Sequence, residues 1–471
     1  MATPTDIRTG LGGPSRAHRK YFTRMVGSFV GVMGLFSLVN TWVNPLWVTP
    51  SPWTSDHLFA DSRQIYRDLR TAKAGLVRSK QWDTVFLGSS RIAIAFDPAM
   101  PQWGDHKVVN LGLSGGSLTE QDAFVNYIFE KQKGVKTIYL GVDPTDLTDA
   151  TDMARNAGFY ESPMNPAGDV VEREMRYVTG VSSFIASSRT LKTRFWVELP
   201  GDEQKDKKLH PSFLTHLKEA IRTRDTMDNK HLPPYTGLGH WLRDRSVRPV
   251  RAILETDSIP HALRMIRQRK AKQEKIADNK VKALAHILDN CLSRGVELKL
   301  LLPPNYAAYL AVFHIDNDPD PSFSKVRELV VDMVAKANAA HPEAKPVTVW
   351  DFFDFHPLNA EPLSSVDPKT GFLHYWADGT HSLETLGHVM LKRMNGWPID
   401  DPKEADYGRE IDVHNVQDRL KEIRAQYQTY RKTYPEDIKW VEEIMSKYAS
   451  VGPEKQGAAE GEDQDNPTPG Q

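Results

Sequence analysis

An uncharged apolar run near the N-terminus constrains this chain more than any other feature. Residues 25–43, MVGSFVGVMGLFSLVNTWV, contain no charged side chain, and after Arg24 the next charged residue is Asp56. As a helix this run is about 28 Å long, close to the hydrocarbon thickness of a bilayer. The run therefore predicts a transmembrane anchor at 25–45. A cleaved signal peptide and a buried core helix remain as alternatives.

The charges before the run predict which way it crosses the membrane. Five basic residues precede it: Arg8, Arg16, Arg19, Lys20 and Arg24. No acidic residue lies between Asp6 and the run. Because basic flanks stay in the cytoplasm, residues 1–24 should form a cytoplasmic tail, and the rest of the chain should lie outside. Three tryptophans are expected at the outer membrane interface: Trp42, Trp47 and Trp53.

Charge and cysteine content exclude several classes of protein. The chain has 60 Lys and Arg against 61 Asp and Glu, a net charge of −1, whereas nucleic-acid binders carry a basic excess. The single cysteine, Cys291, allows neither an intramolecular disulfide nor a cysteine-based metal site. The 16 histidines form no compact ligand pattern, and no phosphate-binding glycine loop is present. We therefore expect no metal and no cofactor.

Short apolar runs alternate with helical patterns along the body of the chain. The runs are typical of strands buried on both faces, and they lie at 83–88, 107–116, 135–143, 296–304 and 346–353. Helical patterns follow Ser117-Leu-Thr-Glu120, a capping-box spacing, and cover 271–294 and 322–338. This alternation predicts an α/β fold of three layers, α/β/α, with a mostly parallel five-stranded sheet.

The remaining segments complete the predicted organisation. The α/β domain should cover 60–400, with an insertion or lid-like subdomain at about 147–270. Residues 401–450 should form a C-terminal helical segment that Pro435 interrupts. Its apolar stripe, which could pack on the domain or meet a partner, is Val413, Val416, Leu420, Ile423, Tyr427 and Tyr430. The tail at 451–471 is rich in Gly, Pro and acidic residues and should be disordered.

Polar blocks follow the predicted strands, where open parallel sheets bind their ligands. Gly88-Ser89-Ser90-Arg91 follows the first strand, the glycine-rich stretch Asn110–Gly116 the second, and Gly141-Val-Asp143 the third. Asp378-Gly-Thr-His381 comes late, just before another helical pattern. A serine nucleophile needs a histidine base and a carboxylate to orient that base, and the developing oxyanion needs backbone N–H donors.

Each block also has a simpler interpretation. Ser90 could cap the following helix, the glycines could serve a tight turn, and Asp378 could cap a helix beside a surface His381. The order of the blocks favours catalysis, because serine, glycine and Asp-x-x-His would all meet at one sheet edge.

This order resembles the SGNH (GDSL-type) hydrolase superfamily over about 80–145 and 296–395. The resemblance implies that Ser90 is the nucleophile, that His381 and Asp378 complete the triad, and that Gly115 and Ser90 supply the oxyanion hole.

The chain departs from the family pattern at two of these blocks. Ser89 stands where the family usually has aspartate, and Asp143 stands where it has asparagine. Asp143 could orient loops, and Arg91 could bind an anionic or sugar substrate or pair with an acid. We count Arg91, Asn110 and Asp143 as candidate substrate-binding residues.

Gly-Ser-Ser-Arg behind an N-terminal anchor is similar to a narrower group, the membrane-tethered proteins of alginate O-acetylation and teichoic-acid D-alanylation. The resemblance implies an acyltransferase or esterase at the bacterial cytoplasmic (inner) membrane, with its catalytic domain periplasmic or extracellular. It would work beside a multi-pass membrane-bound O-acyltransferase and acylate, as by acetylation, a cell-envelope polysaccharide. The alternative is a catalytically inactive SGNH-fold scaffold, or a glycan-binding partner in such an acylation or export complex.

Overall fold

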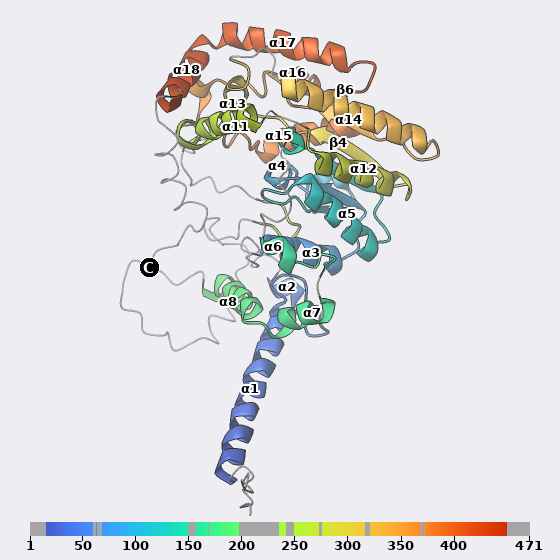
Figure 1. Cartoon of the computed structure of the whole chain (residues 1–471), viewed down its shortest axis with the longest axis vertical. Helices are drawn as coiled ribbons and strands as arrows, with labels where there is room; N and C mark the ends of the chain where they lie inside the picture. The colour runs from blue at the N-terminus through green and yellow to red at the C-terminus, as the bar shows by residue number, and fades with distance from the viewer. Residues whose placement is uncertain are drawn as a thin grey trace, which may run out of the picture. The chain divides into compact units, whose positions relative to one another are not determined.

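The computed structural model divides the chain into two compact units, residues 1–64 with 169–232 and residues 65–168 with 233–471 (Figure 1). The described residues are 16–59, 63, 68–148, 157–167, 169–196, 235–241, 249–272, 276–315, 321–367, 371 and 373–449. The predicted disordered tail at 451–471 and most of the predicted cytoplasmic tail lie outside these residues.

The larger unit is built on a mixed sheet of six strands. They are β1 (Thr84–Leu87), β2 (Val108–Asn110), β3 (Thr137–Gly141), β4 (Glu297–Leu302), β5 (Thr348–Asp351) and β6 (Arg409–Ile411). Their spatial order is β2-β1-β3-β4-β5-β6, with β1 to β5 parallel and β6 antiparallel to β5. The five predicted strands are confirmed. The expectation of only five was wrong, because β6 has three residues and lies in a segment whose pattern is helical.

Strands β1 to β5 are largely buried on both faces, as their continuous apolar runs predict. On one face, Phe86 and Tyr139 are neighbours across the β1–β3 pair, with ring centroids 5.4 Å apart. Phe96 and Trp103 pack against the same rings, which forms an aromatic core under the β1 end of the sheet.

Helices follow the strands as the sequence pattern predicts. The predicted ones are α5 (Leu118–Lys131), α12 (Asp278–Leu292), α14 (Pro321–Ala340) and α15 (Glu384–Asn395). Ser117 caps α5, its hydroxyl accepting the Glu120 N–H at 3.5 Å. The other helices between β1 and β5 and around them are α3 (Leu69–Ser79), α4 (Ser90–Ala95), α6 (Ala157–Glu161), α10 (Val250–Ile253), α11 (Ile259–Lys272) and α13 (Ala307–Ala311). A π-helical turn, Leu254–Ser258, joins α10 to α11.

The C-terminal segment packs on this unit. Of the two alternatives for its apolar stripe, the structure therefore shows packing on the domain. It forms α16 (Pro402–Ala405), β6, α17 (Val416–Thr433) and α18 (Pro435–Ala449), with the break at Pro435 as expected. Five stripe residues are buried: Val416, Leu420, Ile423, Tyr427 and Tyr430. Val413 was wrongly assigned to the stripe, since it precedes α17 and is 43% exposed.

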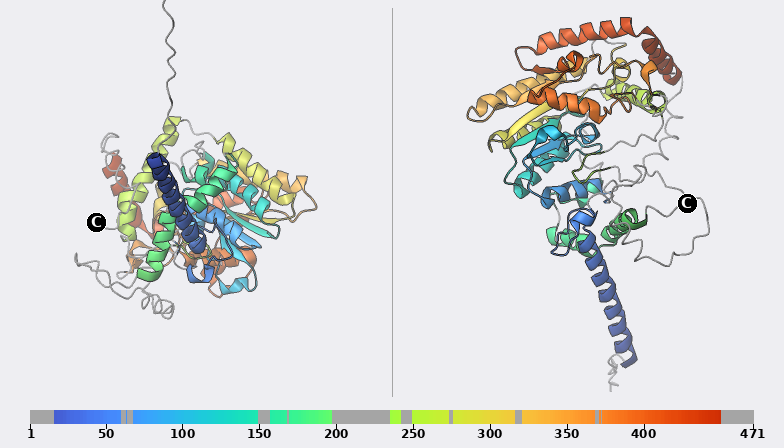
Figure 2. Two further views of the ribbon diagram at one scale, coloured as in Figure 1. Left: turned by 90° about the horizontal axis from the view of Figure 1, so that it is seen from below. Right: turned by 180° about the vertical axis from the view of Figure 1, so that it is seen from behind.

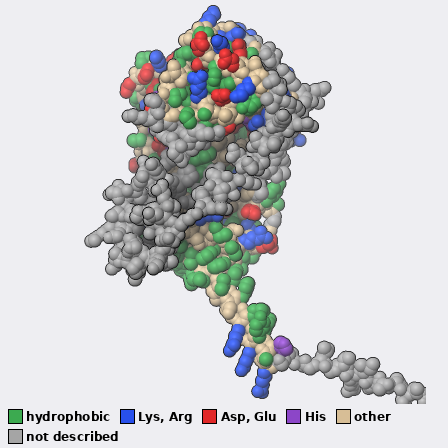
Figure 3. All heavy atoms as spheres, turned by 90° about the vertical axis from the view of Figure 1, so that its left-hand side faces the viewer, with side chains coloured by type: hydrophobic (Ala, Val, Ile, Leu, Met, Phe, Trp, Pro, Cys, Tyr) green, Lys and Arg blue, Asp and Glu red, His purple; other side chains and the backbone are tan. Residues whose placement is uncertain are grey.

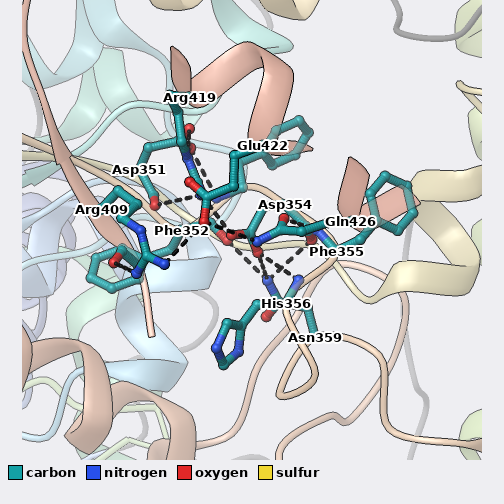
Figure 4. Close-up of polar contacts among 12 residues, drawn as sticks. Asp351, Phe352, Asp354, Phe355, His356, Asn359, Arg409, Arg419, Glu422 and Gln426 are labelled. Atoms are coloured by element: carbon teal, nitrogen blue, oxygen red, sulfur yellow. Dashed lines mark hydrogen bonds and ion pairs between the residues drawn. The ribbon is translucent and has the colours of Figure 1, made fainter. Parts of the chain in front are cut away.

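A buried polar cluster joins α17 to the end of β5 (Figure 4). The Arg419 guanidinium pairs with Asp351 at 3.1 Å and with Asp354 at 2.5 Å, and Arg327 of α14 pairs with Asp351 at 2.8 Å. Burial alone would raise the pKa of Asp351, but the two guanidiniums hold it below its usual range. The cluster therefore fixes α14, α17 and β5 to one another through charged hydrogen bonds.

The smaller unit contains α1 (Arg16–Val43), α2 (Asp56–Phe59), α7 (Val170–Thr179) and α8 (Val181–Trp196). Helix α1 is long and apolar enough to cross a membrane, and its most apolar stretch is not buried by the described chain. The alternative of a buried core helix is therefore wrong. One of the three tryptophans expected at a membrane interface is misplaced: Trp47 is buried, with the Arg63 guanidinium 4.7 Å from its ring, whereas Trp42 and Trp53 are exposed.

The predicted insertion at 147–270 is not one subdomain. Of its described residues, 169–196 belong with α1 in the smaller unit, whereas 147–148, 157–167, 235–241 and 249–270 belong with the sheet. Residues 235–241 form a small hairpin closed by a bridge between Tyr235 and Trp241. Most of the remainder between α8 and α10 lies outside the described residues.

Candidate active site

The Gly-Ser-Ser-Arg block forms a sharp turn from β1 into α4. Gly88 has φ +141, a conformation that favours glycine, and a Cβ there would lie 2.6 Å from the Ile92 side chain. Ser89 is the N-cap of α4, its hydroxyl accepting the Arg91 N–H at 3.3 Å. Ser90 is the first residue of the helix. The cap and the candidate nucleophile are therefore two different serines, side by side.

Ser90 lies within hydrogen-bond reach of the late Asp-x-x-His block. Its Oγ is 2.8 Å from His381 Nε2, and His381 Nδ1 is 2.7 Å from Asp378 Oδ2. Because the carboxylate accepts from Nδ1–H, Nε2 is left to accept the serine proton. The three residues, separated by up to 291 positions in sequence, form an ordered Ser–His–Asp chain.

The Asp-x-x-His spacing has a local reason. One oxygen of Asp378, Oδ1, accepts the backbone N–H groups of Thr380 at 2.8 Å and His381 at 2.9 Å. The other oxygen holds the imidazole, so one carboxylate shapes the loop and orients the base. Asp378 caps no helix, since the N-cap of α15 is Leu383. The His381 side chain is 20% exposed, which leaves it accessible to a substrate.

The loop after β2 brings a second candidate donor to this edge of the sheet. A turn closed by the Gly116 N–H and the Leu113 carbonyl at 2.9 Å contains Gly115, whose φ is +61. The Leu113 N–H donates to the Gly88 carbonyl at 2.8 Å, which joins this loop to the β1 turn. Within the described chain, the N–H groups of Ser90 and Gly115 form no hydrogen bond, as oxyanion donors require.

Three glycines, which follow β2, end β3 and lie in α15, allow these elements to approach α4 closely. The sequence alone does not reveal this role. A Cβ on Gly112 would lie 2.7 Å from the backbone N of Ala93, and one on Gly141 would lie 2.5 Å from Ile92. A Cβ on Gly387 of α15 would lie 1.7 Å from the Ala95 carbonyl oxygen. These close approaches hold the middle and the C-terminal end of the helix that carries Ser90.

Asn110 forms hydrogen bonds with the C-terminal end of α4, which contradicts its expected role as a substrate contact. It is fully buried, and its Nδ2 donates to the carbonyls of Ile92 and Phe96, each at 2.8 Å. Its Oδ1 accepts the Gly112 N–H at 2.9 Å. Asn110 is thus a positioning residue for the helix, because its amide is used entirely by the protein backbone.

Arg91 and Asp143 form an ion pair at 3.1 Å between α4 and the loop after β3. Their side chains are only 10% and 15% exposed. Of the alternatives for Arg91, the structure therefore shows the pairing with an acid. Asp143 stands where an asparagine was expected, and its charge is balanced by the residue after the nucleophile.

The hairpin at 235–241 is a part of the site that the sequence did not predict. Its Trp241 N–H donates to the Ala93 carbonyl at 2.7 Å, and its His240 Nε2 is 2.8 Å from the Ile94 carbonyl. Burial lowers the pKa of His240, in keeping with a neutral ring that donates to a carbonyl. The Trp241 ring lies 6.4 Å from the His381 ring, so this hairpin forms one wall beside the base.

Lys73 of α3 binds this hairpin through a hydrogen bond to its backbone. It is fully buried, and its Nζ donates to the carbonyls of Asn110 at 2.8 Å and Gly239 at 2.5 Å. Burial lowers the pKa of Lys73 well below its usual value. In the sequence, only the clustered aromatic and glycine residues of Tyr235–Trp241 could have indicated this hairpin.

Asn305 is a further residue that the sequence did not single out. It follows β4, is 1% exposed, and its side-chain oxygen and nitrogen form no hydrogen bond with the described chain. The next residue, Tyr306, donates its N–H to the carbonyl of Gly379 at 3.1 Å, inside the Asp-x-x-His loop. A buried amide without a partner therefore lies beside this loop.

A cavity of about 300 Å³ elsewhere in the larger unit is lined by residues that include Arg251, Asp437 and Trp440. None of the Ser–His–Asp residues lines it, so it is separate from the site above. Among the described residues, no group of His, Cys, Asp and Glu could hold a metal ion. Comparisons of the chain with protein-family models, with curated proteins and with solved structures found no match.

Proposed function

We propose that this chain is a membrane-anchored serine acyltransferase or esterase of SGNH type. The observation that carries the proposal is the chain of contacts from Ser90 Oγ to His381 Nε2 at 2.8 Å and from His381 Nδ1 to Asp378 at 2.7 Å. A neutral histidine in this orientation can take the serine proton, and the carboxylate stabilises the imidazolium that forms. A three-layer fold is part of the proposal, and the helices that follow β1 to β5 support it.

The reaction would proceed through an acyl-enzyme. Ser90 Oγ attacks the acyl carbonyl while its proton moves to His381, and the N–H groups of Ser90 and Gly115 stabilise the oxyanion. His381 then protonates the leaving group. A sugar hydroxyl or water, deprotonated by His381, attacks the acyl-serine and releases the acylated glycan or the free acid. No step needs a metal or a cofactor.

The place of action follows from the anchor. Helix α1 with its basic start supports a single pass with the N-terminus in the cytoplasm, and the catalytic unit would then be periplasmic or extracellular. There the acceptor would be a cell-envelope polysaccharide, and a multi-pass membrane-bound O-acyltransferase would supply the acyl group. A scaffold without chemistry would need no aligned triad, whereas hydrolysis or transfer does.

The test is hydrolysis of p-nitrophenyl acetate by the full chain in detergent. The full chain is used because α1 covers parts of α7 and α8. Ser90→Ala should reduce the turnover number to background, since no other described group replaces the nucleophile. Ser89→Ala is the matched control, because it removes a helix cap worth about 1 kcal/mol and leaves the triad intact. Equal activity of wild type and S90A would contradict the proposal.

A further inference from the structure

Helices α7 and α8 expose large apolar side chains. Nothing in the described chain covers these side chains. Figure 3 shows hydrophobic side chains gathered where α1 meets the helices packed on it, with Lys and Arg at the other end of α1. The exposed fractions are 72% for Val171, 56% for Met175, 60% for Val181 and 42% for Ile185. Exposed apolar area of this kind marks an interaction surface.

The buried face of α8 has the opposite character, since most of its residues are small and only Phe184 beside them is large. The small residues are buried at helical spacing: Ser183, Ala186, Ser187 and Thr190. A soluble helix usually buries its large apolar residues and exposes its polar ones. Small residues inside and apolar residues outside are instead typical of helices that pack in a lipid environment.

The contacts between α1 and α8 lie within the apolar run. The rings of Phe36 and Phe184 are stacked with centroids 4.2 Å apart. Phe36 precedes the end of α1 at Val43 by about 10 Å along the helix axis. If α1 spans the bilayer, Phe184 therefore lies at hydrocarbon depth, beside Val181 and Ile185.

Asn40, a polar residue inside the apolar run, gives an independent reason for this placement. An amide in hydrocarbon needs hydrogen-bond partners within the protein. Asn40 is fully buried, its Nδ2 donates to the Val178 carbonyl at 2.9 Å, and its Oδ1 accepts the Ser187 hydroxyl at 2.9 Å. The α7–α8 pair thus satisfies the polar group that α1 carries into the membrane.

We infer that the apolar sides of α7 and α8 lie in the lipid leaflet at the C-terminal end of α1, with Val171, Val181 and Ile185 in contact with acyl chains. The exposed Glu172–Arg176 ion pair of α7 would then lie at the level of the headgroups. The ligand of this surface is the bilayer itself, because the surface continues the lipid-facing side of α1. Beyond the apolar part, α8 carries Arg189 and Lys192, suited to lipid headgroups. The inference rests on the proposed anchoring by α1 and adds a second contact with the membrane.

The test places nitroxide labels on single cysteines of the full chain in phosphatidylcholine–phosphatidylglycerol nanodiscs. The labelled variants are Val171→Cys, Val181→Cys and Ile185→Cys. Controls are Leu35→Cys in α1 and Lys439→Cys, which is exposed on α18. The native Cys291 is buried, and burial raises the pKa of its thiol to about 12, so it should remain unlabelled. Collision rates with oxygen, which partitions into lipid, are compared with those of a water-soluble nickel chelate.

Oxygen collisions should exceed nickel collisions at the three positions and at L35C, with the order reversed at K439C. Nickel accessibility at the three positions, with L35C still in lipid, would overturn the inference and leave the anchor intact. Protection from both reagents would overturn it as well, because a protein rather than lipid would then cover the surface. Nickel accessibility at L35C would reject the anchor, and the inference would fall with it.

Discussion

Ser89 and Ser90 divide between them two roles that one serine could have had. Ser89 caps α4, and Ser90 Oγ contacts His381. Both depend on the sharp turn at Gly88, which allows the chain to pass from a buried strand to a helix within three residues. The position of the hydroxyl is therefore set by backbone packing around α4 as much as by the triad itself.

Gly112 provides a prediction at this scale. Its nearest neighbours are backbone atoms, Ala93 N at 2.7 Å and the Ser89 carbonyl oxygen at 3.0 Å from a built Cβ, and backbone cannot yield as a flexible side chain can. Gly112→Ala should displace the first turn of α4 and lower the turnover number by about 10²-fold, the usual cost of a displacement near 1 Å. The measurement is p-nitrophenyl acetate hydrolysis, with thermal unfolding recorded in parallel.

Gly134→Ala is the matched control for this prediction. A Cβ there has the Trp82 carbonyl oxygen as its nearest neighbour, at 3.9 Å, so the methyl group fits. G134A should keep wild-type turnover. Full activity in a folded G112A variant would show that close packing on α4 does not position Ser90.

At the residue scale, the sequence predicted which serine, histidine and aspartate come together but not their surroundings. Ser90, Asp378 and His381 could be identified because the order of short blocks along the chain is visible in one sequence. The Arg91–Asp143 pair and the place of Trp241 depend on distances across the fold, which no local pattern encodes. Asn110 was misassigned for the same reason, since its burial is a property of the packed structure.

At the element scale, the main feature is the attachment of α17 to the sheet. Asp351 at the end of β5 accepts from Arg327 and Arg419, and all three side chains are almost completely buried. A buried charge is stable only while its partners remain. The helical pattern within 401–450 predicted α17, but only the fold shows that Arg419, on a helix surface by sequence, is a core residue.

Asp351→Asn should lower the free energy of unfolding at pH 7 by about 3–5 kcal/mol, because it leaves two buried guanidiniums short of a charge partner. The control is Asp418→Asn on the exposed side of α17, which should leave the free energy of unfolding almost unchanged. Urea unfolding of the full chain in detergent measures both. An Asp351→Asn variant as stable as D418N would contradict the role given to the cluster.

The contribution of Asp351 to the free energy of unfolding should also depend on pH in a defined direction. The folded-state pKa of Asp351 is depressed, so its contribution is fully present above the unfolded value of about 3.9 and is lost as the pH falls through the folded pKa. The difference in unfolding free energy between wild type and D351N should therefore shrink only in acid, below the usual aspartate range. A difference that shrinks already between pH 5 and pH 7 would contradict this assignment.

At the scale of the whole molecule, the chain combines a unit whose helix α1 is long and apolar enough to cross a membrane with an α/β unit that carries the Ser–His–Asp chain. The sequence predicted the long apolar helix α1 and the alternating strands and helices of the α/β body, which Figure 2 shows, because both rest on hydrophobic patterns. It did not predict that α7 and α8 belong to the same unit as α1, since the charges of α7 and α8 hide their small-residue and apolar faces.

The proposed mechanism requires an acyl-serine intermediate on Ser90. The full chain in detergent is mixed with p-nitrophenyl acetate, quenched in acid within the first turnover, and analysed by intact mass and peptide mapping. One acetyl group should appear on Ser90 in wild type and in S89A, and none should appear in S90A. Turnover without an adduct, or an adduct on a residue other than Ser90, would contradict the proposed mechanism.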